Sequence, residues 1–252
     1  MEKAFKYRLY QSSIYNLATS LSQGSGLGTS VSLVDMVKSL AVKKGNVYEV
    51  DCELLDLLFD NNHFSRSILN GLQNVVKLFD ESVELEKIDA SEIYGEFPEL
   101  LKELEQSFES RNLKLRFEKR GTAGTISVNP SKLFIAVEEI VINSLKFGKT
   151  GTEIIIEDFI KEDSYHILVS NEIDSSLYEG ITPEKESLVI EPFYRIQPPA
   201  DEHLRVSRFG LGLGLTMISY IVDCFGGEFK IQNQKKGDKV TVSAEISIPL
   251  CG

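Results

Sequence analysis

Proline is absent from the first 97 residues of this 252-residue chain and then occurs seven times, first at Pro98. A proline inside a helix removes a backbone hydrogen bond and clashes with the preceding turn, so a long proline-free stretch permits long helices. The sequence before Pro98 therefore predicts helices, and the sequence after it predicts shorter, mixed elements. We expect two domains, residues 1–97 and residues 98–252.

The first domain is expected to contain two long helices, 5–42 and 50–85, joined by a turn at 43–46. Apolar residues of the second helix recur at spacings of three, four and seven and so share one face. They are Leu57, Phe64, Ile68, Leu72, Val75, Phe79 and Val83. A single antiparallel hairpin buries little apolar surface, so we expect a homodimer with a four-helix bundle. The alternative is that this face packs only against the rest of the same chain.

Beyond Pro98 the sequence alternates between strand and helix patterns. The expected strands are 113–117, 125–128, 153–160, 165–170, 228–233 and 239–248. The expected helices are 131–147, which follows the start signal Asn129-Pro130, and 213–225, which Gly226-Gly227 closes. This order predicts an α+β sandwich in which helices cover one face of a single sheet.

The net charge of −11 argues against nucleic acid or an anionic membrane surface as the partner. No apolar run approaches the length of a membrane span, and the N-terminus lacks the apolar stretch of a signal peptide. Three scattered cysteines, Cys52, Cys224 and Cys251, fit neither a disulfide framework nor a zinc site. We expect reduced thiols and a cytoplasmic protein.

A first candidate for chemistry lies in the helix expected at 131–147. Glu139, Asn143 and Lys146 stand at i, i+4 and i+7 and form one polar column in an otherwise apolar helix. A carboxylate, an amide oxygen and an amine in a row suit a site for phosphate and Mg²⁺. A solvated stripe on an amphipathic helix is the alternative explanation.

A second candidate is the run of three alternate glycines, Gly210, Gly212 and Gly214, directly before the helix expected at 213–225. Glycines there leave backbone N–H groups able to close around anionic oxygens at the positive end of the helix. The run lacks the Gly-Lys-Ser/Thr of a Walker loop, and no strand precedes it as in a Rossmann fingerprint. A tight turn for packing explains the glycines equally well.

The order of these segments around Glu191-Pro192-Phe193-Tyr194-Arg195 is more specific. From Pro98 to Leu250 it resembles the ATP-binding domain of the histidine kinases and their relatives in the gyrase/Hsp90/MutL (GHKL) superfamily. The resemblance implies ATP and Mg²⁺ as cofactors, with the GLGLGL run beside the phosphates. Residues 196–209 would form a mobile lid over the nucleotide.

The resemblance also implies individual roles. Asn143 would hold Mg²⁺ through its amide oxygen, and Lys146 would contact phosphate. Glu139 would stand where the superfamily places its water-activating or proton-accepting carboxylate. Arg195 would lie at the entry to the lid.

The chain departs from the family where a strand should run into an Asp-x-Gly-x-Gly turn whose aspartate accepts a hydrogen bond from adenine. Asn171 takes the place of the aspartate, and both glycines are missing from the positions that follow. An amide oxygen still accepts a hydrogen bond but loses the contribution of the charge, about 1 kcal/mol. Asp174 would substitute if the register slipped.

A second departure concerns the phosphoacceptor. Sensor kinases carry a phosphorylated histidine on the first helix of their dimerisation domain, and Gln23 stands at that position here. Glutamine has no nucleophilic nitrogen at neutral pH. We interpret His63 as a surface or cap residue, His166 as structural and His203 as exposed in the lid.

Three functions remain open at this point. The first is a histidine-kinase-like two-component signalling protein that acts as a dimer by docking a response-regulator receiver domain or another regulatory protein, with nucleotide as a ligand. The second is an active ATP-dependent histidine kinase that phosphorylates a partner or an unusual residue of its own. The third is a protein that sequesters a regulator, as anti-sigma kinases do. The chain is expected to be a stand-alone transmitter or one excised from a longer protein.

Overall fold

The computed structural model describes residues 12–19, 21–22, 27–120, 123–177, 180–196, 211–236 and 239–252. The chain divides into two compact units. One comprises Met1–Asp80 and Glu191–Leu213 and is called the helical unit below. The other comprises Glu81–Ile190 and Gly214–Gly252 and is called the sheet domain.

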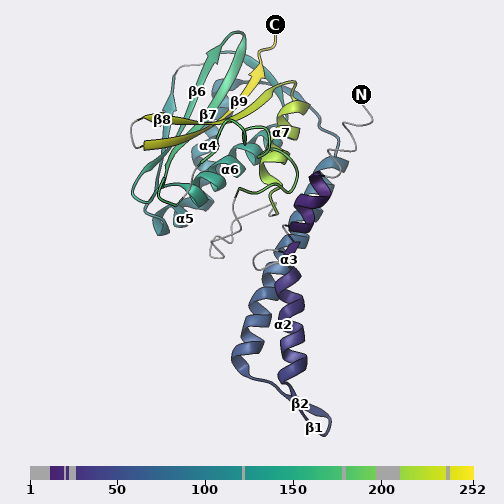
Figure 1. The fold of residues 1–252 in the computed structure, drawn as a ribbon. Coiled ribbons are helices and arrows are strands. Elements are labelled where there is room, and N and C mark those ends of the chain that lie inside the picture. The colour runs from purple at the N-terminus through teal and green to yellow at the C-terminus, as the bar shows by residue number, and fades with distance from the viewer. Residues whose placement is uncertain are drawn as a thin grey trace. The chain divides into compact units, whose positions relative to one another are not determined.

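The helical unit contains α2 (Leu27–Leu40) and α3 (Cys52–Asp80), which lie side by side (Figure 1). Residues 12–19 and 21–22 are also helical. The turn expected between the two helices is part of an antiparallel hairpin, β1 (Val42–Lys44) and β2 (Val47–Glu49). Gly45 permits this turn because its φ of +64° is left-handed, and Val and Tyr favour the strands.

The seam between α2 and α3 buries only part of the apolar stripe predicted for α3. Ile68 is 7% exposed, whereas Leu57 is 57% exposed. A polar layer crosses the seam: Asn61 Nδ2 donates to Ser30 Oγ at 2.5 Å, and the hydroxyl oxygens of Ser30 and Ser65 are 2.9 Å apart. The seam is therefore mixed, and large apolar side chains stay on the surface of this unit.

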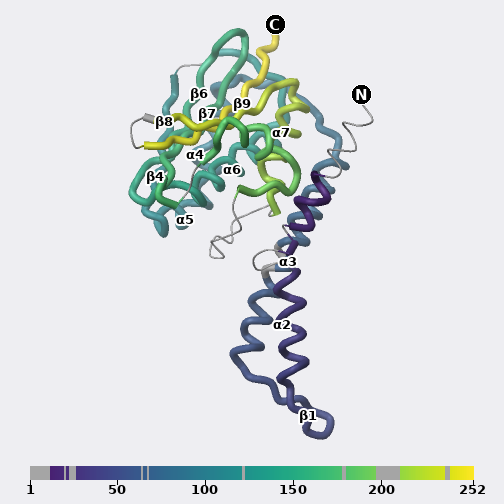
Figure 2. The backbone as a smooth tube through the Cα atoms, in the orientation of Figure 1, coloured from purple at the N-terminus to yellow at the C-terminus, as the bar shows by residue number. Residues whose placement is uncertain are grey.

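The sheet domain is built on a five-stranded sheet in the order β4-β6-β7-β9-β8 (Figure 2). The strands are β4 (Lys114–Lys119), β6 (Glu153–Lys161), β7 (Ser164–Ile173), β8 (Glu228–Lys236) and β9 (Lys239–Pro249). β4 pairs with β6 in parallel, and the other neighbours are antiparallel. A separate antiparallel pair joins β3 (Glu86–Asp89) to β5 (Thr125–Val128).

Helices cover one face of this sheet (Figure 1). They are α4 (Ala90–Leu100), the 3₁₀ turn η1 (Leu101–Leu104), α5 (Glu105–Ser110), α6 (Pro130–Phe147) and α7 (Gly214–Cys224). Every second residue of β7 from Tyr165 to Ile173 is buried, because these side chains face the helices. Leu133 of α6 and Ile167 of β7 are both 0% exposed in this core. The predicted α+β class, with one helix-covered sheet, is confirmed.

The two compact units divide at Asp80 and Glu81, earlier in the chain than Pro98, which lies inside α4. The reason is that β3 pairs with β5, and α4 follows β3 directly. Asp89 caps α4, with its Oδ1 accepting a hydrogen bond from Ser91 N at 2.7 Å. Within the described residues, none of the helices combines the length and hydropathy of a membrane span.

Candidate functional site

Helix α6 carries the polar column, and its start is fixed by a cap that the sequence predicted. Asn129 has extended backbone, and its Oδ1 accepts a hydrogen bond from Lys132 N at 3.0 Å. Pro130 occupies the first turn, where its missing N–H costs nothing. The helix then runs to Phe147, so Asn143 and Lys146 fall in its last two turns.

The column is not the solvated stripe that was the alternative explanation. Glu139 is only 3% exposed, and Asn143 and Lys146 are half-buried. The side chain of Asn143 makes no hydrogen bond to any residue that the structure describes. A buried carboxylate one turn before a half-buried amide is unusual in a helix core and typical of a ligand site.

Glu139 lies directly against the start of α7. A Cβ placed on Gly214, the first residue of α7, would be 2.4 Å from Glu139 Oε1 and 3.0 Å from its Cγ and Cδ. Only glycine therefore fits at this position while Glu139 keeps its place. The first N–H groups of a helix have no intrahelical partner and carry partial positive charge, so this end of α7 suits anionic oxygens.

The other predicted residues of the glycine run lie in the helical unit or outside the described residues. Gly212 has a left-handed φ of +77°, and a Cβ there would be 2.5 Å from the carbonyl oxygen of Tyr194. Its own carbonyl accepts a hydrogen bond from Phe193 N at 3.2 Å. Gly210 and residues 197–209 of the expected lid are outside the described residues.

Arg195 comes directly after Tyr194 and also belongs to the helical unit. Desolvation by burial lowers the pKa of its guanidinium, which nevertheless stays charged at neutral pH. It forms no ion pair with any residue in the described ranges. A desolvated arginine that has no ion pair within the described ranges is suited to an anion.

Asn171 lies within β7, because the strand continues to Ile173 and does not end at Ser170 as expected. It is opposite Ile154 of β6 and Val242 of β9, and it is 5% exposed on the helix-facing side. Asp174, the alternative residue, lies beyond the end of this strand.

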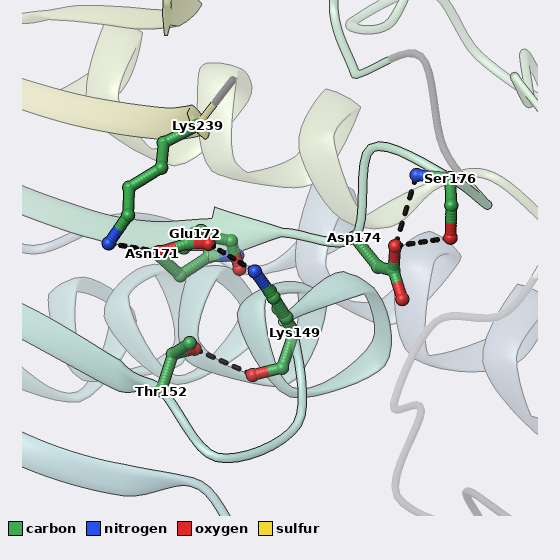
Figure 3. A network of polar contacts seen from close by, with 7 residues as sticks. All are labelled: Lys149, Thr152, Asn171, Glu172, Asp174, Ser176 and Lys239. Atoms are coloured by element: carbon green, nitrogen blue, oxygen red, sulfur yellow. Dashed lines mark hydrogen bonds and ion pairs between the residues drawn. The ribbon is translucent and has the colours of Figure 1, made fainter. Parts of the chain in front are cut away.

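Asp174 comes after the strand and is held in a local turn (Figure 3). Its Oδ1 accepts hydrogen bonds from Ser176 Oγ at 2.6 Å and from Ser176 N at 3.0 Å. These two hydrogen bonds lower the pKa of the Asp174 carboxyl.

The end of β7 is also tied to the loop that follows α6. Lys149 N donates to the carbonyl of Glu172 at 2.8 Å, and Lys149 Nζ lies 2.7 Å from Glu172 Oε1 (Figure 3). Lys239 Nζ of β9 lies 3.4 Å from Glu172 Oε2. The hydrogen bond from Lys149 lowers the pKa of Glu172 and raises that of Lys149. Sequence reasoning missed this network because its members come from three separate segments.

Gly180 was missed as well. Its φ of +74° is left-handed, and a Cβ there would be 2.6 Å from Asn233 Nδ2 on β8. Asn233 Oδ1 accepts a hydrogen bond from Ile181 N at 2.9 Å. Gly180 is thus a turn glycine that follows β7, but it comes later in the chain than the positions where the resemblance implies glycines. In the sequence, Gly180-Ile181 directly before Thr182-Pro183 is the pattern that could have predicted this turn.

Of the residues considered as phosphoacceptors, some lie in the described part of the chain and others do not. Gln23 and His203 lie outside the described residues. His63 is exposed on α3. His166 Nδ1 lies 2.7 Å from Glu245 Oε1, and its ring stacks on Phe159 with centroids 4.9 Å apart, as expected of a structural histidine.

Comparison with known proteins finds relatives in sequence and in fold. Residues 128–249 match the family of histidine kinase-, DNA gyrase B- and HSP90-like ATPases. The sensor histidine kinase ZraS of Salmonella typhimurium is 27% identical over 139 residues, which are 54% of this chain and 27% of ZraS. The chain thus matches little more than a quarter of that relative's length.

Two solved structures share the fold. The histidine kinase ThkA in complex with the response regulator protein TrrA has a TM-score of 0.57 at 12% identity, covering 88% of this chain and 57% of that one. Full-length ShkA in complex with AMPPNP has a TM-score of 0.56 at 15% identity, covering 96% and 47%. The family match and the shared fold together define the class of the domain: residues 128–249 are similar to the histidine kinase-, DNA gyrase B- and HSP90-like ATPases, and the chain has the fold of histidine kinase structures.

Proposed function

We propose that this chain is a histidine-kinase-like two-component signalling protein that binds ATP with Mg²⁺ and acts by docking a partner. The partner would be the receiver domain of a response regulator or another regulatory protein. The observation that carries the proposal is the polar column of α6, with Glu139 buried against Gly214 at the start of α7.

The residues of the sheet domain fit a nucleotide and its metal. Asn143 offers a half-buried amide oxygen without a described partner, which is a suitable Mg²⁺ ligand. Gly214 allows Glu139 to lie against the start of α7, whose first N–H groups suit anionic oxygens, and Lys146 adds a positive charge on the helix that carries Glu139. Bound Mg²⁺ would neutralise phosphate charge, while Asn143 orients the metal and Lys146 the phosphates.

Docking is supported by the surface of the helical unit. Val31, Leu69 and Val76 are 61%, 53% and 58% exposed, although they lie on packed helices. Exposed apolar helix faces mark interaction surfaces. We infer a homodimer through this unit, with the receiver domain docking beside it. The ThkA–TrrA complex is the precedent for a histidine kinase that holds a response regulator.

The proposal does not include phosphorylation at Gln23, because an amide nitrogen is not nucleophilic. A second candidate, active kinase chemistry toward a partner or another residue, is favoured by one observation. Glu139 is buried within reach of the start of α7, where a proton-accepting carboxylate would serve phosphoryl transfer.

Incubation with γ-labelled ATP and Mg²⁺, alone and with a panel of purified receiver domains, separates the two candidates. The docking function predicts that a receiver domain binds the dimer while no label reaches either protein. Label that appears on the chain or a receiver, and is lost in Asn143→Ala, identifies a kinase. A chain that binds neither nucleotide nor any receiver contradicts the proposal.

A further inference from the structure

The last turn of α6, which carries Lys146, is held by an arginine from outside the helix. The last four carbonyl groups of a helix have no partner within it and carry partial negative charge. Gly148 N donates to one of them, the carbonyl of Ser144, at 2.8 Å. Arg111, the residue that caps the end of α5, donates from Nη2 to the carbonyl of Lys146 at 3.1 Å and to that of Gly148 at 3.4 Å. A charged donor thus satisfies backbone oxygens at the end of α6.

This contact is part of a close approach between the turn after α5 and the loop after α6. Gly151 N donates to the carbonyl of Asn112 at 2.9 Å, and Asn112 has a left-handed φ of +49°. A Cβ on Gly148 would be 3.3 Å from Leu113 Cδ1, so glycine lets the two segments meet. The Arg111 side chain is half-buried, and its Nε is fully buried. The guanidinium is therefore confined beside the end of α6.

The turn that Arg111 holds belongs to the proposed nucleotide site. Arg111 contacts the backbone of Lys146 itself, and Asn143 lies three residues earlier on the same helix. Helix ends fray where their carbonyls have no partner. Without the cap, the backbone at Lys146 would unwind, and its side chain would lose a fixed direction. Glu139 lies more than two turns before the end of α6, and its position depends instead on Gly214.

We propose that Arg111 is a positioning residue for phosphate binding, which holds the last turn of α6 and thereby orients the Lys146 amine toward the phosphate groups of the nucleotide. Arg111 acts through Lys146 and not by a contact of its own, since its Nη2 is engaged by the two carbonyls. Its charge also offsets the negative end of the helix, which would otherwise disfavour phosphate nearby. This inference rests on the proposed nucleotide binding.

A double-mutant cycle on the dissociation constant of ATP, measured by calorimetric titration of the full chain with Mg²⁺, tests it. Arg111→Met and Lys146→Met should each raise the constant by about tenfold, because both disturb the same contact with phosphate. In a chain that already carries Lys146→Met, Arg111→Met should change the constant by less than about twofold. A cap with a merely structural role would lower stability in urea unfolding and leave the dissociation constant unchanged.

Arg116→Met is the matched control, because it removes the same charge from β4, where Arg116 pairs with Glu118 and Glu153. This variant should leave the dissociation constant unchanged. Arg111→Gln takes the place of Arg111→Met in the cycle if circular dichroism shows that the methionine variant is unfolded. An unchanged constant in the Arg111 variant, or equal losses with and without Lys146→Met, overturns the inference and leaves nucleotide binding in place. Failure of the natural protein to bind ATP overturns the proposed function as well.

Discussion

The sheet domain and the helical unit differ in how completely each buries its apolar side chains. In the sheet domain, core residues such as Leu133, Ile154 and Ile167 are 0% exposed. In the helical unit, the most buried side chains of the α2–α3 seam keep 6–9% exposure, and Val31 and Val76 are 61% and 58% exposed. The core of the sheet domain is closed, whereas the seam between α2 and α3 is only partly closed.

From this difference we infer which region is complete within one chain and which region packs against another surface. A sheet covered by helices satisfies its apolar side chains within one chain, because the helices shield a whole face. Two helices with a mixed seam have no such cover. We expect the proposed nucleotide site to belong to the complete region, and assembly and docking to belong to the incomplete one.

The largest effect is expected from a cavity in the sheet core. Ile167→Ala removes three buried carbons and should lower the free energy of unfolding of the sheet domain by about 2–5 kcal/mol. Leu177→Ala, at a side chain 66% exposed in the same domain, should change it by less than about 0.5 kcal/mol. Urea unfolding followed by near-ultraviolet circular dichroism measures both. If both variants lost the same free energy of unfolding, the core of the sheet domain would not be closed around Ile167.

The next effect concerns the contact between α6 and α7. Gly214→Ala forces a methyl group against Glu139 and should destabilise the sheet domain by about 1–3 kcal/mol. Glu139→Ala in the same chain should recover part of this loss, which a double-mutant cycle measures.

Gly95→Ala is the control for the glycine change. A Cβ on Gly95 meets nothing within 4 Å, and alanine is the better helix former, so this variant should gain up to about 1 kcal/mol. If Gly214→Ala behaved like Gly95→Ala, the close approach of Glu139 to α7 would be refuted.

A charge introduced on the exposed apolar face of α3 tests the inference that the helical unit packs against a second copy of the chain. Val76→Glu should raise the dissociation constant of the dimer by at least about tenfold, because burial of an unpaired carboxylate is unfavourable. The unfolding of the sheet domain should not change. Lys77→Glu, at an exposed position next to it, is the control. Light scattering that found the natural chain monomeric would contradict the inferred assembly.

The smallest effect is a pH dependence from the Glu172 network. The folded state lowers the pKa of Glu172 below its ordinary value of 4.5, so its contribution to stability is present above that pH and is lost as the pH falls through the lowered pKa. Glu172→Gln should therefore lower the free energy of unfolding modestly at neutral pH, where the contribution of Glu172 is present, and converge with the natural protein at acid pH, so that the profile is flatter on the acid side. A profile of the variant that parallels the natural one would show that Glu172 contributes nothing.

Local patterns predicted much of the sheet domain. β5 occupies the residues expected, and α6 begins at the cap that Asn129-Pro130 indicated. The spacing of Glu139, Asn143 and Lys146 placed them on one helix face. The strand that holds Asn171 was expected to end at Ser170 and in fact continues to Ile173.

Features that depend on tertiary contacts were not predictable in this way. α4 was missed because Gly95 and Pro98 are poor helix residues, yet its buried face, with Tyr94 and Phe97 3% and 0% exposed, outweighs their preferences. Lys149, Glu172 and Lys239 come together only when β7 and β9 pair. The burial of Glu139 depends on Gly214, which is distant in sequence.

The most direct test of nucleotide binding is calorimetric titration of the full chain with ATP, with and without Mg²⁺, beside Asn143→Ala. We predict saturable binding that requires Mg²⁺ and that weakens by about tenfold or more when Asn143 loses its amide oxygen. Absence of binding up to millimolar ATP, or binding that Asn143→Ala leaves intact, would contradict the assignment of this site.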